Sequence, residues 1–319
     1  MIIKRHLGNT NIEVSPIGLG VLQFAGGHGF FNLIHHKLPQ ISMNDIIRSA
    51  IDGGINWFDT AEIYGGGKAE RSLAIALKAA GQKNGDVVVA TKWFPIMRTA
   101  RNISDTIDSR LRYLYGFDID LYQVHFPYYW SSTSQIMNRM ADLVKNGKIK
   151  SIGVSNFSTD LMCVAHKTLA ERGLSLASNQ VHYSLLNRRI ERNGIIDLAK
   201  QLGITIIAYS PLESGLLSGK FHDNPQVFAQ TPFWRRIRLK SQLEKCRSVI
   251  NTLKEIAKAH NATPSQVALN WLINFHGETV VAIPGASKAE HVQDNAQAMH
   301  FKLASSEMDE IDKVTRHFR

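Results

Sequence analysis

Four ionisable side chains stand where three successive apolar segments of this 319-residue chain end. Asp59 ends the first segment, and Tyr64 follows five positions later, directly before three consecutive glycines. Lys92 ends the second segment and His125 ends the third. In α/β barrels the active site lies at the carboxyl ends of the strands. The spacing therefore predicts that these four side chains face one site.

These residue types suit the reduction of a carbonyl group, in which carbon gains a hydride and oxygen gains a proton. A phenol has a pKa of about 10, and a neighbouring ammonium group stabilises the phenolate and lowers that pKa. We expect Asp59 to keep Lys92 charged, Tyr64 to act as the general acid, and His125 to orient the same oxygen as an N–H donor. Each residue alone has an ordinary structural explanation, so the interpretation depends on all four together. This chemistry needs no metal ion.

Carbonyl reduction also requires a hydride donor, and later segments offer groups that could hold one. Ser155, Asn156, Gln180 and Tyr209 stand in or after three later apolar segments, where amides, a hydroxyl and a ring could hold a flat carboxamide-bearing ring. Small residues after Tyr209 would let backbone N–H groups approach a pyrophosphate. The segment 283–288 opens a helix whose N-terminus favours phosphate, although an ordinary turn explains it equally well. The candidate residues are Ser210, Pro211, Leu212, Ser214, Gly215, Leu217, Lys220, Gly285, Ala286, Ser287 and Lys288.

Apolar segments alternate with amphipathic ones along the chain, which predicts strands alternating with helices. Strands are predicted at 16–20, 55–59, 86–92, 119–125, 148–155, 177–181, 204–209 and 280–283. Helices are predicted at 42–52, 68–80, 104–115, 133–146, 159–172, 192–202, 241–260, 288–298 and 306–317, with a further one after Thr263. Capping-box patterns begin at Ser42 and Thr263. A hairpin is predicted over 2–14, a long loop over 22–40, and an irregular segment after Tyr209.

The nearly continuous apolar strands are typical of a parallel sheet that is covered on both faces. Eight strand–helix units in 319 residues predict a closed (β/α)8 TIM barrel with an N-terminal β-hairpin and an extra C-terminal helix. We expect one domain over 1–319. An open doubly wound sheet is the alternative, which the lack of a G-x-G-x-x-G motif after the first strand disfavours.

The composition, with 44% hydrophobic residues and a net charge of +10, is that of a globular protein. No apolar run reaches the roughly 20 residues of a membrane span, and the first residues lack the apolar core of a signal peptide. Cys163 and Cys246 form no C-x-x-C pair, as expected of inert thiols in a reducing cytosol. The densest basic cluster, 235–240, is expected in a loop, and no nucleic-acid-binding motif accompanies it. We expect a cytoplasmic protein that acts on a small molecule, without nucleic acid, membrane or metal; the oligomeric state stays undecided.

Together these segments resemble the aldo-keto reductase family over nearly the whole chain. The resemblance implies NADP(H)-dependent interconversion of carbonyls and alcohols, on a barrel whose bottom the hairpin closes. It makes Asp59, Tyr64, Lys92 and His125 a catalytic tetrad with Tyr64 as the proton donor. Ser155, Asn156 and Gln180 would hold the nicotinamide carboxamide, and Tyr209 would stack on its ring. The motifs that carry the resemblance are Gly18-Leu19-Gly20, Asp59-Thr60-Ala61 with Tyr64-Gly65, Ala90-Thr91-Lys92, Asp120-Leu121-Tyr122-Gln123-Val124-His125, Gly153-Val154-Ser155-Asn156-Phe157, Asn179-Gln180, Tyr209-Ser210-Pro211-Leu212 and Ile283-Pro284-Gly285-Ala286.

Glu70-Arg71 and the segment 177–181 look most like bacterial and chloroplast members, some of them similar to pyridoxal reductases. Two positions depart from the family pattern. Leu22 stands where many members carry an aromatic residue of the substrate pocket, and the candidates to replace it are Trp93, Phe94, Phe126, Tyr128 and Trp130. Gly285 and His291 stand where many members carry a lysine and an arginine near the 2′-phosphate of NADP. The nearest cations are Lys288, Arg235 and Arg236, and Asp294 and Asn295 would lie near the adenine.

The resemblance therefore implies NADPH as the cofactor and leaves NAD open. Two other functions also stay open. Potassium-channel β subunits share this fold, so a regulatory subunit that binds the cofactor and senses redox state is an alternative to an enzyme. A basic nucleic-acid-binding protein is the third interpretation, and it predicts a steep salt dependence of binding.

Overall fold

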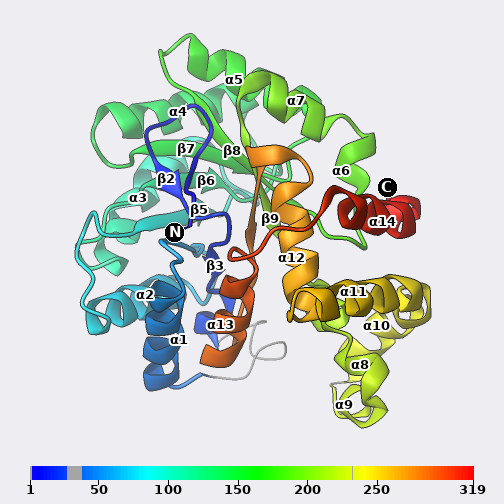
Figure 1. The fold of residues 1–319 in the computed structure, drawn as a ribbon. Coiled ribbons are helices and arrows are strands. Elements are labelled where there is room, and N and C mark those ends of the chain that lie inside the picture. The colour runs from blue at the N-terminus through cyan, green and yellow to red at the C-terminus, as the bar shows by residue number, and fades with distance from the viewer. Residues whose placement is uncertain (1, 27–37, 232) are drawn as a thin grey trace.

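A closed barrel of eight parallel strands forms the centre of the computed structural model, which describes residues 2–26, 38–231 and 233–319. The strands follow one another around the barrel in chain order. Two parallel bridges, Ile17 to Ala282 and Gly20 to Gly285, join the first strand to the last. The predicted (β/α)8 barrel is thus confirmed (Figure 1). Its strands are β3 (Leu19–Gly20), β4 (Trp57–Asp59), β5 (Val88–Trp93), β6 (Leu121–Val124), β7 (Ser151–Ser155), β8 (Leu176–His182), β9 (Thr205–Tyr209) and β10 (Val280–Ile283).

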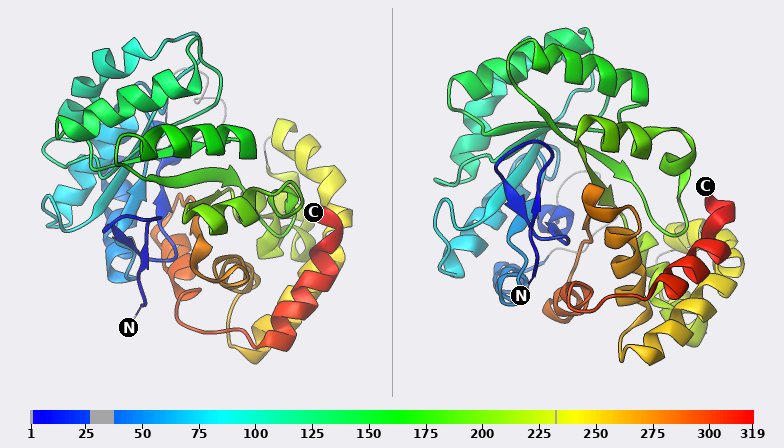
Figure 2. Two further views of the ribbon diagram at one scale, coloured as in Figure 1. Left: turned by 90° about the horizontal axis from the view of Figure 1, so that it is seen from above. Right: turned by 45° about the horizontal axis from the view of Figure 1, so that its top comes forward.

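An antiparallel hairpin of β1 (Arg5–His6) and β2 (Glu13–Val14) lies across one end of the barrel, as Figure 2 shows. Leu7 and Val14 from the hairpin segment are fully buried in one cluster with barrel residues such as Trp57. The Trp57 indole donates a hydrogen bond to the carbonyl of Ser15 at 2.9 Å. The hairpin therefore closes the end of the barrel opposite the predicted site, as expected.

The helices pack outside the strands, because alternate strand residues point away from the barrel axis. Predicted starts are confirmed at Thr133 and Pro264, where Ser132 and Thr263 form complete capping boxes. The predicted box at Ser42 is wrong, because α1 already begins at Gln40 after Pro39. These helices are α1 (Gln40–Asp52), α2 (Lys68–Ala79), α3 (Arg101–Tyr113), α4 (Thr133–Lys145), α5 (Thr159–Ala170), α6 (Arg189–Arg192), α7 (Ile195–Leu202), α12 (Pro264–Asn274), α13 (Ala289–Gln297) and α14 (Ser305–Thr315).

The segment after β9 is helical, and the prediction that it is irregular is wrong. Short helices with local caps explain the error, because they carry no long hydrophobic period; Asn224, for example, caps α9 and Pro225 is its first residue. The basic cluster 235–240 lies in a helix instead of a loop, and the predicted helix 241–260 is two helices that meet at Cys246. The elements are η3 (Glu213–Ser218), α8 (Lys220–Asp223), α9 (Pro225–Ala229), α10 (Phe233–Lys245) and α11 (Arg247–Ala259).

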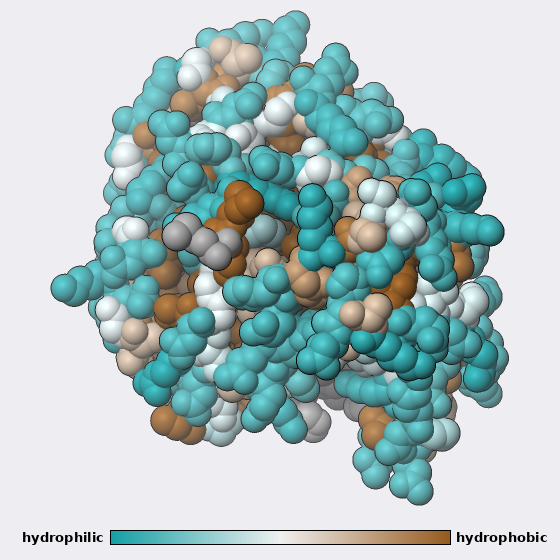
Figure 3. Space-filling model, viewed as in Figure 1, coloured by the Kyte–Doolittle hydropathy of each residue, from teal (hydrophilic) through white to brown (hydrophobic). Residues whose placement is uncertain are grey.

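Of the loop predicted at 22–40, the first residues form a 3-10 turn, η1 (Leu22–Ala25), and residues 27–37 lie outside the described part of the chain. In the ranges that are described, no helix has the length and apolar character to cross a membrane. The face of the molecule that carries the hairpin is mostly hydrophilic, with hydrophobic side chains in small separate groups (Figure 3).

Candidate active site

An ion pair between Lys92 and Asp59 lies inside the barrel, at the carboxyl ends of β5 and β4. Lys92 is 0% exposed and Asp59 is 2% exposed. The second carboxylate oxygen of Asp59 accepts hydrogen bonds from the side-chain amides of Gln123 and Gln180, both at 3.0 Å. The ammonium of Lys92 also donates to the carbonyl of Thr60 at 2.8 Å. Both carboxylate oxygens of Asp59 thus have partners, which fixes the Lys92 side chain inside the carboxyl end of the barrel.

Gln123 contacts the Asp59–Lys92 pair, and the sequence analysis did not predict this contact. It stands two residues before His125 in β6, so both side chains point to the same face of the strand. A polar residue in an otherwise apolar strand, at that spacing from a candidate catalytic residue, was the available signal.

Tyr64 follows β4 in the turn that the three glycines complete. Its ring centroid lies 5.3 Å from the Lys92 Nζ atom and 5.8 Å from the ring centroid of His125. Burial raises the pKa of Tyr64 above its usual value, although the charge of Lys92 opposes this. Lys92 thus lowers this pKa as expected, but the loss of water on burial outweighs the nearby cation, so the net pKa is raised. The phenol keeps its proton at neutral pH.

His125 lies in the same site, and its imidazole is neutral. Burial, and then the positive charge of Lys92, lowers the pKa of His125 to about 2. Its Nδ1 atom is buried and has no hydrogen-bond partner among the residues that the structure describes. Phe126 stacks on the ring, with centroids 4.4 Å apart and planes 6° apart. A neutral imidazole in this place can donate an N–H hydrogen bond but does not carry charge.

A cavity of about 320 Å³ opens over these residues. It brings together members of all three predicted groups: catalytic, cofactor-binding and substrate-binding. Val21 and Gln23 line it as well, although the sequence did not single them out, together with Gly20 and Ile283 from two of the sequence motifs. The predicted residues on its wall are Asp59, Tyr64, His125, Ser155, Asn156, Gln180, Tyr209, Ser210, Gly285, Leu22 and Phe126.

One chain of hydrogen bonds fixes the polar wall of the cavity. The Tyr209 hydroxyl donates to the Asn156 side-chain oxygen at 3.1 Å, and the Asn156 amide donates to the Ser155 hydroxyl at 3.0 Å. Ser155 in turn donates to the carbonyl of Gln180 at 2.9 Å. Asn156 has a left-handed backbone with a φ of 62°, which costs energy in a non-glycine residue and is common at functional sites.

The model of the aldo/keto reductase family matches residues 16–316. The chain belongs to this family. An uncharacterized oxidoreductase of Mycobacterium tuberculosis (strain ATCC 25618 / H37Rv) is 37% identical over 313 residues, which cover 96% of this chain and 91% of the relative. The chloroplastic pyridoxal reductase of Arabidopsis thaliana is 30% identical over 326 residues, covering 96% and 84%.

Among solved structures, a thermostable aldo-keto reductase in complex with the inhibitor epalrestat has a TM-score of 0.78 and 28% sequence identity. The match covers 98% of this chain and 100% of that one. This protein is thus an oxidoreductase of a carbonyl-reducing family, and members of that family use nicotinamide cofactors.

The cavity of this aldo-keto reductase fits a nicotinamide group. Two buried polar atoms on its wall, His125 Nδ1 and Gln23 Oε1, lack partners within the described residues, so a polar ligand has groups to meet. Tyr209 supplies an aromatic ring, and the ring of His182 lies parallel to it, at a centroid distance of 5.3 Å and an angle of 14°.

His182 is held in turn by Glu213, and sequence reasoning missed both residues. The Glu213 carboxylate lies 2.6 Å from His182 Nε2 and accepts a hydrogen bond from the Ser184 hydroxyl at 2.6 Å. Glu213 belongs to the segment after Tyr209 that the sequence assigned to the pyrophosphate. The pair thus ties that segment to β8.

Other predicted cofactor residues lie outside the cavity. His291 is close enough to Lys220 and Lys288 for both to lower its pKa, although burial is the larger cause. Asp294 accepts hydrogen bonds from Thr263 and Gln266, at 3.1 Å and 2.7 Å. The side chains of Pro211, Leu217, Ala286 and Asn295 are buried, whereas Ser214 and Ser287 are exposed and Leu212 and Gly215 are intermediate.

Of the five predicted aromatic candidates for the substrate pocket, only Phe126 lines the cavity, and Trp93, Phe94, Tyr128 and Trp130 do not. Trp93 is fully buried outside the barrel wall, where its indole donates to Asn102 of α3 at 3.0 Å. Because strand side chains alternate, the inward direction of Lys92 sends Trp93 outward. Trp130 is 68% exposed on the loop after β6.

Proposed function

We propose that this aldo-keto reductase reduces an aldehyde or ketone to an alcohol with NADPH, with Asp59, Tyr64, Lys92 and His125 as its catalytic residues. The observation that carries the proposal is the buried Asp59–Lys92 pair directly behind Tyr64, at the floor of the cavity. A buried cation that is held by a carboxylate and lies beside a protonated phenol is an arrangement for moving one proton.

The bound cofactor supplies a hydride to the carbonyl carbon, and the residues of the chain handle the oxygen. Tyr64 donates its proton to the oxygen as negative charge develops there. Lys92 stabilises the resulting phenolate, and Asp59 helps to keep Lys92 charged: burial lowers the pKa of Lys92, but Asp59 and then Tyr64 together outweigh burial and raise it. The neutral ring of His125 donates an N–H hydrogen bond to the same oxygen.

The cofactor's ring would lie against Tyr209, with its carboxamide at Ser155, Asn156 and Gln180. We assign NADPH rather than NADH because three basic side chains lie close together and could meet the 2′-phosphate: Lys220, Lys288 and His291. Fluorescence titration of the purified protein with each cofactor tests the assignment. Tighter binding of NADPH supports the assignment, and equal binding of the two cofactors contradicts it. If neither cofactor binds, the proposed enzymatic function is contradicted.

The substrate would enter between Leu22 and Phe126, two of the apolar side chains of the cavity wall. We therefore propose apolar or aromatic aldehydes and ketones as substrates. The free thiols of Cys163 and Cys246 support a reducing, cytoplasmic location.

Substitution of Tyr64 by phenylalanine tests the proposed proton transfer. We expect turnover to fall by about 100-fold or more, because general acid catalysis contributes that much, while the affinity for NADPH stays within about twofold. Tyr128→Phe is the matched control, since Tyr128 is 66% exposed and should tolerate the loss of its hydroxyl. Near-normal turnover of Tyr64→Phe would contradict the mechanism.

A further inference from the structure

The turn that carries Tyr64 has a backbone with little conformational preference of its own. Gly65, Gly66 and Gly67 follow the tyrosine, with φ angles of 67°, 61° and 91°. Glycine has more backbone freedom than any other residue, so ordering this turn costs more entropy than ordering most turns. A proton donor needs a fixed place, because a misplacement of about 1 Å can slow a reaction by about 100-fold. Contacts with other segments are therefore needed to hold Tyr64.

Glu62, two residues before Tyr64, ties the turn to the segment that carries Lys92. Its carboxylate accepts hydrogen bonds from the Phe94 backbone N–H and from the Arg98 guanidinium, both at 2.9 Å. Its own N–H donates to the Lys92 carbonyl at 3.0 Å. Glu62 is 9% exposed, so water competes little for these bonds. The backbone just before Tyr64 is thus bound at three points to β5 and the residues that follow it.

Glu70 provides a second anchor on the other side of the turn. It lies in the first turn of α2, after Tyr64 and the glycines, and is 0% exposed. The hydroxyl of Thr91, the residue before Lys92, donates to its carboxylate at 2.7 Å. Arg110 of α3 lies 3.2 Å from the other carboxylate oxygen. Burial raises the pKa of Glu70 to about 7, and both forms of the carboxyl group can accept the bond from Thr91.

The proposed proton transfer depends on the contact between Tyr64 and Lys92, and the two anchors join the segments that meet there. We propose that Glu62 and Glu70 are positioning residues, which hold the Tyr64 phenol against the Lys92 ammonium by anchoring the turn to β5. Neither glutamate lines the cavity, so each acts through Tyr64. This inference rests on the proposed function, because it requires that Tyr64 be the proton donor.

Glu62→Ala is the first test, because Arg98 is 31% exposed and water can solvate it when its partner is lost. With benzaldehyde and NADPH, we expect kcat per folded molecule to fall by about 10-fold or more, since the phenol is misplaced. KM and the affinity for NADPH should stay within about twofold. Glu62→Gln should recover kcat to within about threefold, because its amide oxygen can still accept the bond from the Phe94 N–H. Glu255→Ala, at a glutamate that is 71% exposed, is the matched control and should leave kcat unchanged.

Thr91→Val tests the second anchor without unpairing Arg110, whose side chain is 5% exposed. Valine keeps the shape of threonine and removes only the hydroxyl, so this variant should fold. We expect kcat to fall by about 3- to 10-fold at unchanged KM, the effect of one hydrogen bond.

An NMR measurement reports the position of Tyr64 without turnover. When tyrosine is labelled with 13C at Cζ, the Tyr64 signal is the one that is missing in Tyr64→Phe. It should shift or broaden in Glu62→Ala and keep its place in Glu62→Gln and Glu255→Ala. The inference is overturned if Glu62→Ala keeps full kcat, if Glu62→Gln loses as much kcat as Glu62→Ala, or if the Tyr64 signal does not change in Glu62→Ala. Failure of the unsubstituted protein to reduce a carbonyl compound would instead contradict the proposed function.

Discussion

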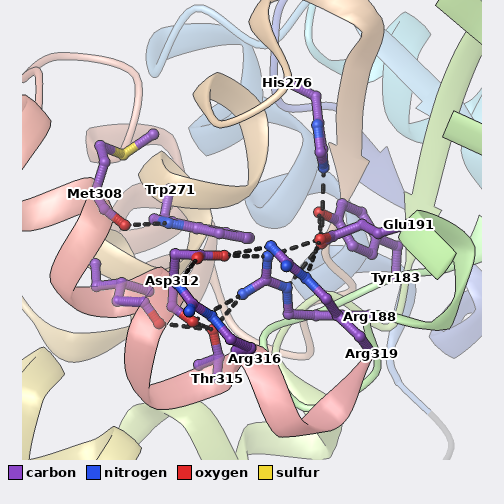
Figure 4. Close-up of polar contacts among 11 residues, drawn as sticks. Tyr183, Arg188, Glu191, Trp271, His276, Met308, Asp312, Thr315, Arg316 and Arg319 are labelled. Carbon is purple, nitrogen blue, oxygen red and sulfur yellow. Dashed lines mark hydrogen bonds and ion pairs between the residues drawn. The ribbon is translucent and has the colours of Figure 1, made fainter. Parts of the chain in front are cut away.

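The cations of Lys92 at the cavity and Arg188 beside the C-terminal helix are both 0% exposed, but their surroundings differ. Arg188 lies within a dense cluster of partners (Figure 4). Its guanidinium donates to Glu191 twice, at 2.7 Å, and to Asp312 and Thr315 at 2.6 Å. The indole of Trp271 covers it, with the guanidinium carbon 4.6 Å from the ring centroid.

Lys92 has fixed partners on one side, and on the other side it interacts with Tyr64, a residue of the cavity wall. Asp59 and Thr60 accept its hydrogen bonds, while the side toward Tyr64 leads to the cavity and to a His125 nitrogen without a partner among the described residues. A buried cation whose donors all have fixed partners, such as Arg188, has nothing left to offer a ligand and serves the fold. A network that has partners on one side and faces the cavity on the other can interact with a ligand that enters the cavity. This difference separates a structural cluster from a candidate catalytic one, although both are buried and charged.

The largest effect that we expect from this comparison is on stability, in Arg188→Met. Removing one partner of a buried ionic network leaves the other charges unpaired, which costs about 3–5 kcal/mol. Urea unfolding should show this loss, while turnover per folded molecule and NADPH affinity stay within about twofold. Arg316→Met is the matched control, because Arg316 bonds the same Asp312 carboxylate but is 62% exposed, and it should cost less than about 1 kcal/mol.

The contrast between the two clusters would break down if Arg188→Met lost catalytic activity in its folded form. That result would mean that the C-terminal cluster positions the site. Equal losses of stability in Arg188→Met and Arg316→Met would show that burial of the network contributes little.

A smaller effect concerns the response of the C-terminal cluster to acid. Burial raises the pKa of Glu191, but interactions with His276, Arg188 and Tyr183 outweigh it, so the net pKa lies well below the usual 4.5. The unfolded chain therefore takes up a proton first as the pH falls. This contribution is fully present above about pH 4.5 and is lost as the pH falls toward the folded-state value.

Urea unfolding of Glu191→Gln and the unsubstituted protein between pH 7 and pH 3 measures this contribution. We expect a difference of about 2 kcal/mol at pH 7 that shrinks toward pH 3, since the amide cannot titrate. Glu255→Gln, an exposed glutamate paired with Lys258, should follow the unsubstituted protein at every pH. A difference that stays constant with pH would show that the Glu191 carboxylate is not stabilised by its charge.

The sequence could predict the barrel because each strand carries its own apolar run, and it could predict the gathering of Asp59, Tyr64, Lys92 and His125 because parallel strands end on one side. Boundaries differ by a few residues, as for the strand predicted at 86–92 and found at Val88–Trp93. The outward direction of Trp93 was also within reach, since it follows from the inward direction of Lys92.

Other parts of the site could not be predicted, because they depend on contacts between distant segments. The carboxylate of Glu213 meets His182 across 31 residues. That contact exists only because the loop after β9 turns back toward β8, and no local pattern encodes the turn. The same holds for Gln23 and Gly285, which become neighbours only when the barrel closes. The single-domain assignment over 1–319 stays a prediction.

The smallest effect that we expect concerns Glu213, in the loop after β9. Ser210, Glu213 and Ser214 all have left-handed backbones, with φ angles of 53°, 48° and 55°, so the loop after β9 needs contacts that hold it. Glu213→Gln keeps an oxygen for the hydroxyl of Ser184 but removes the charge facing His182. We expect NADPH affinity to fall by about 3- to 5-fold, with little change in unfolding, because one charge-assisted hydrogen bond is weakened.

Glu255→Gln again serves as the control, and its NADPH affinity should not change. Fluorescence titration decides the outcome. An unchanged affinity in Glu213→Gln would show that His182 and the loop after β9 keep their places without this carboxylate. If Arg188→Met weakened NADPH binding as much as Glu213→Gln does, the C-terminal cluster would affect the cavity, and the two clusters would have to be treated as one.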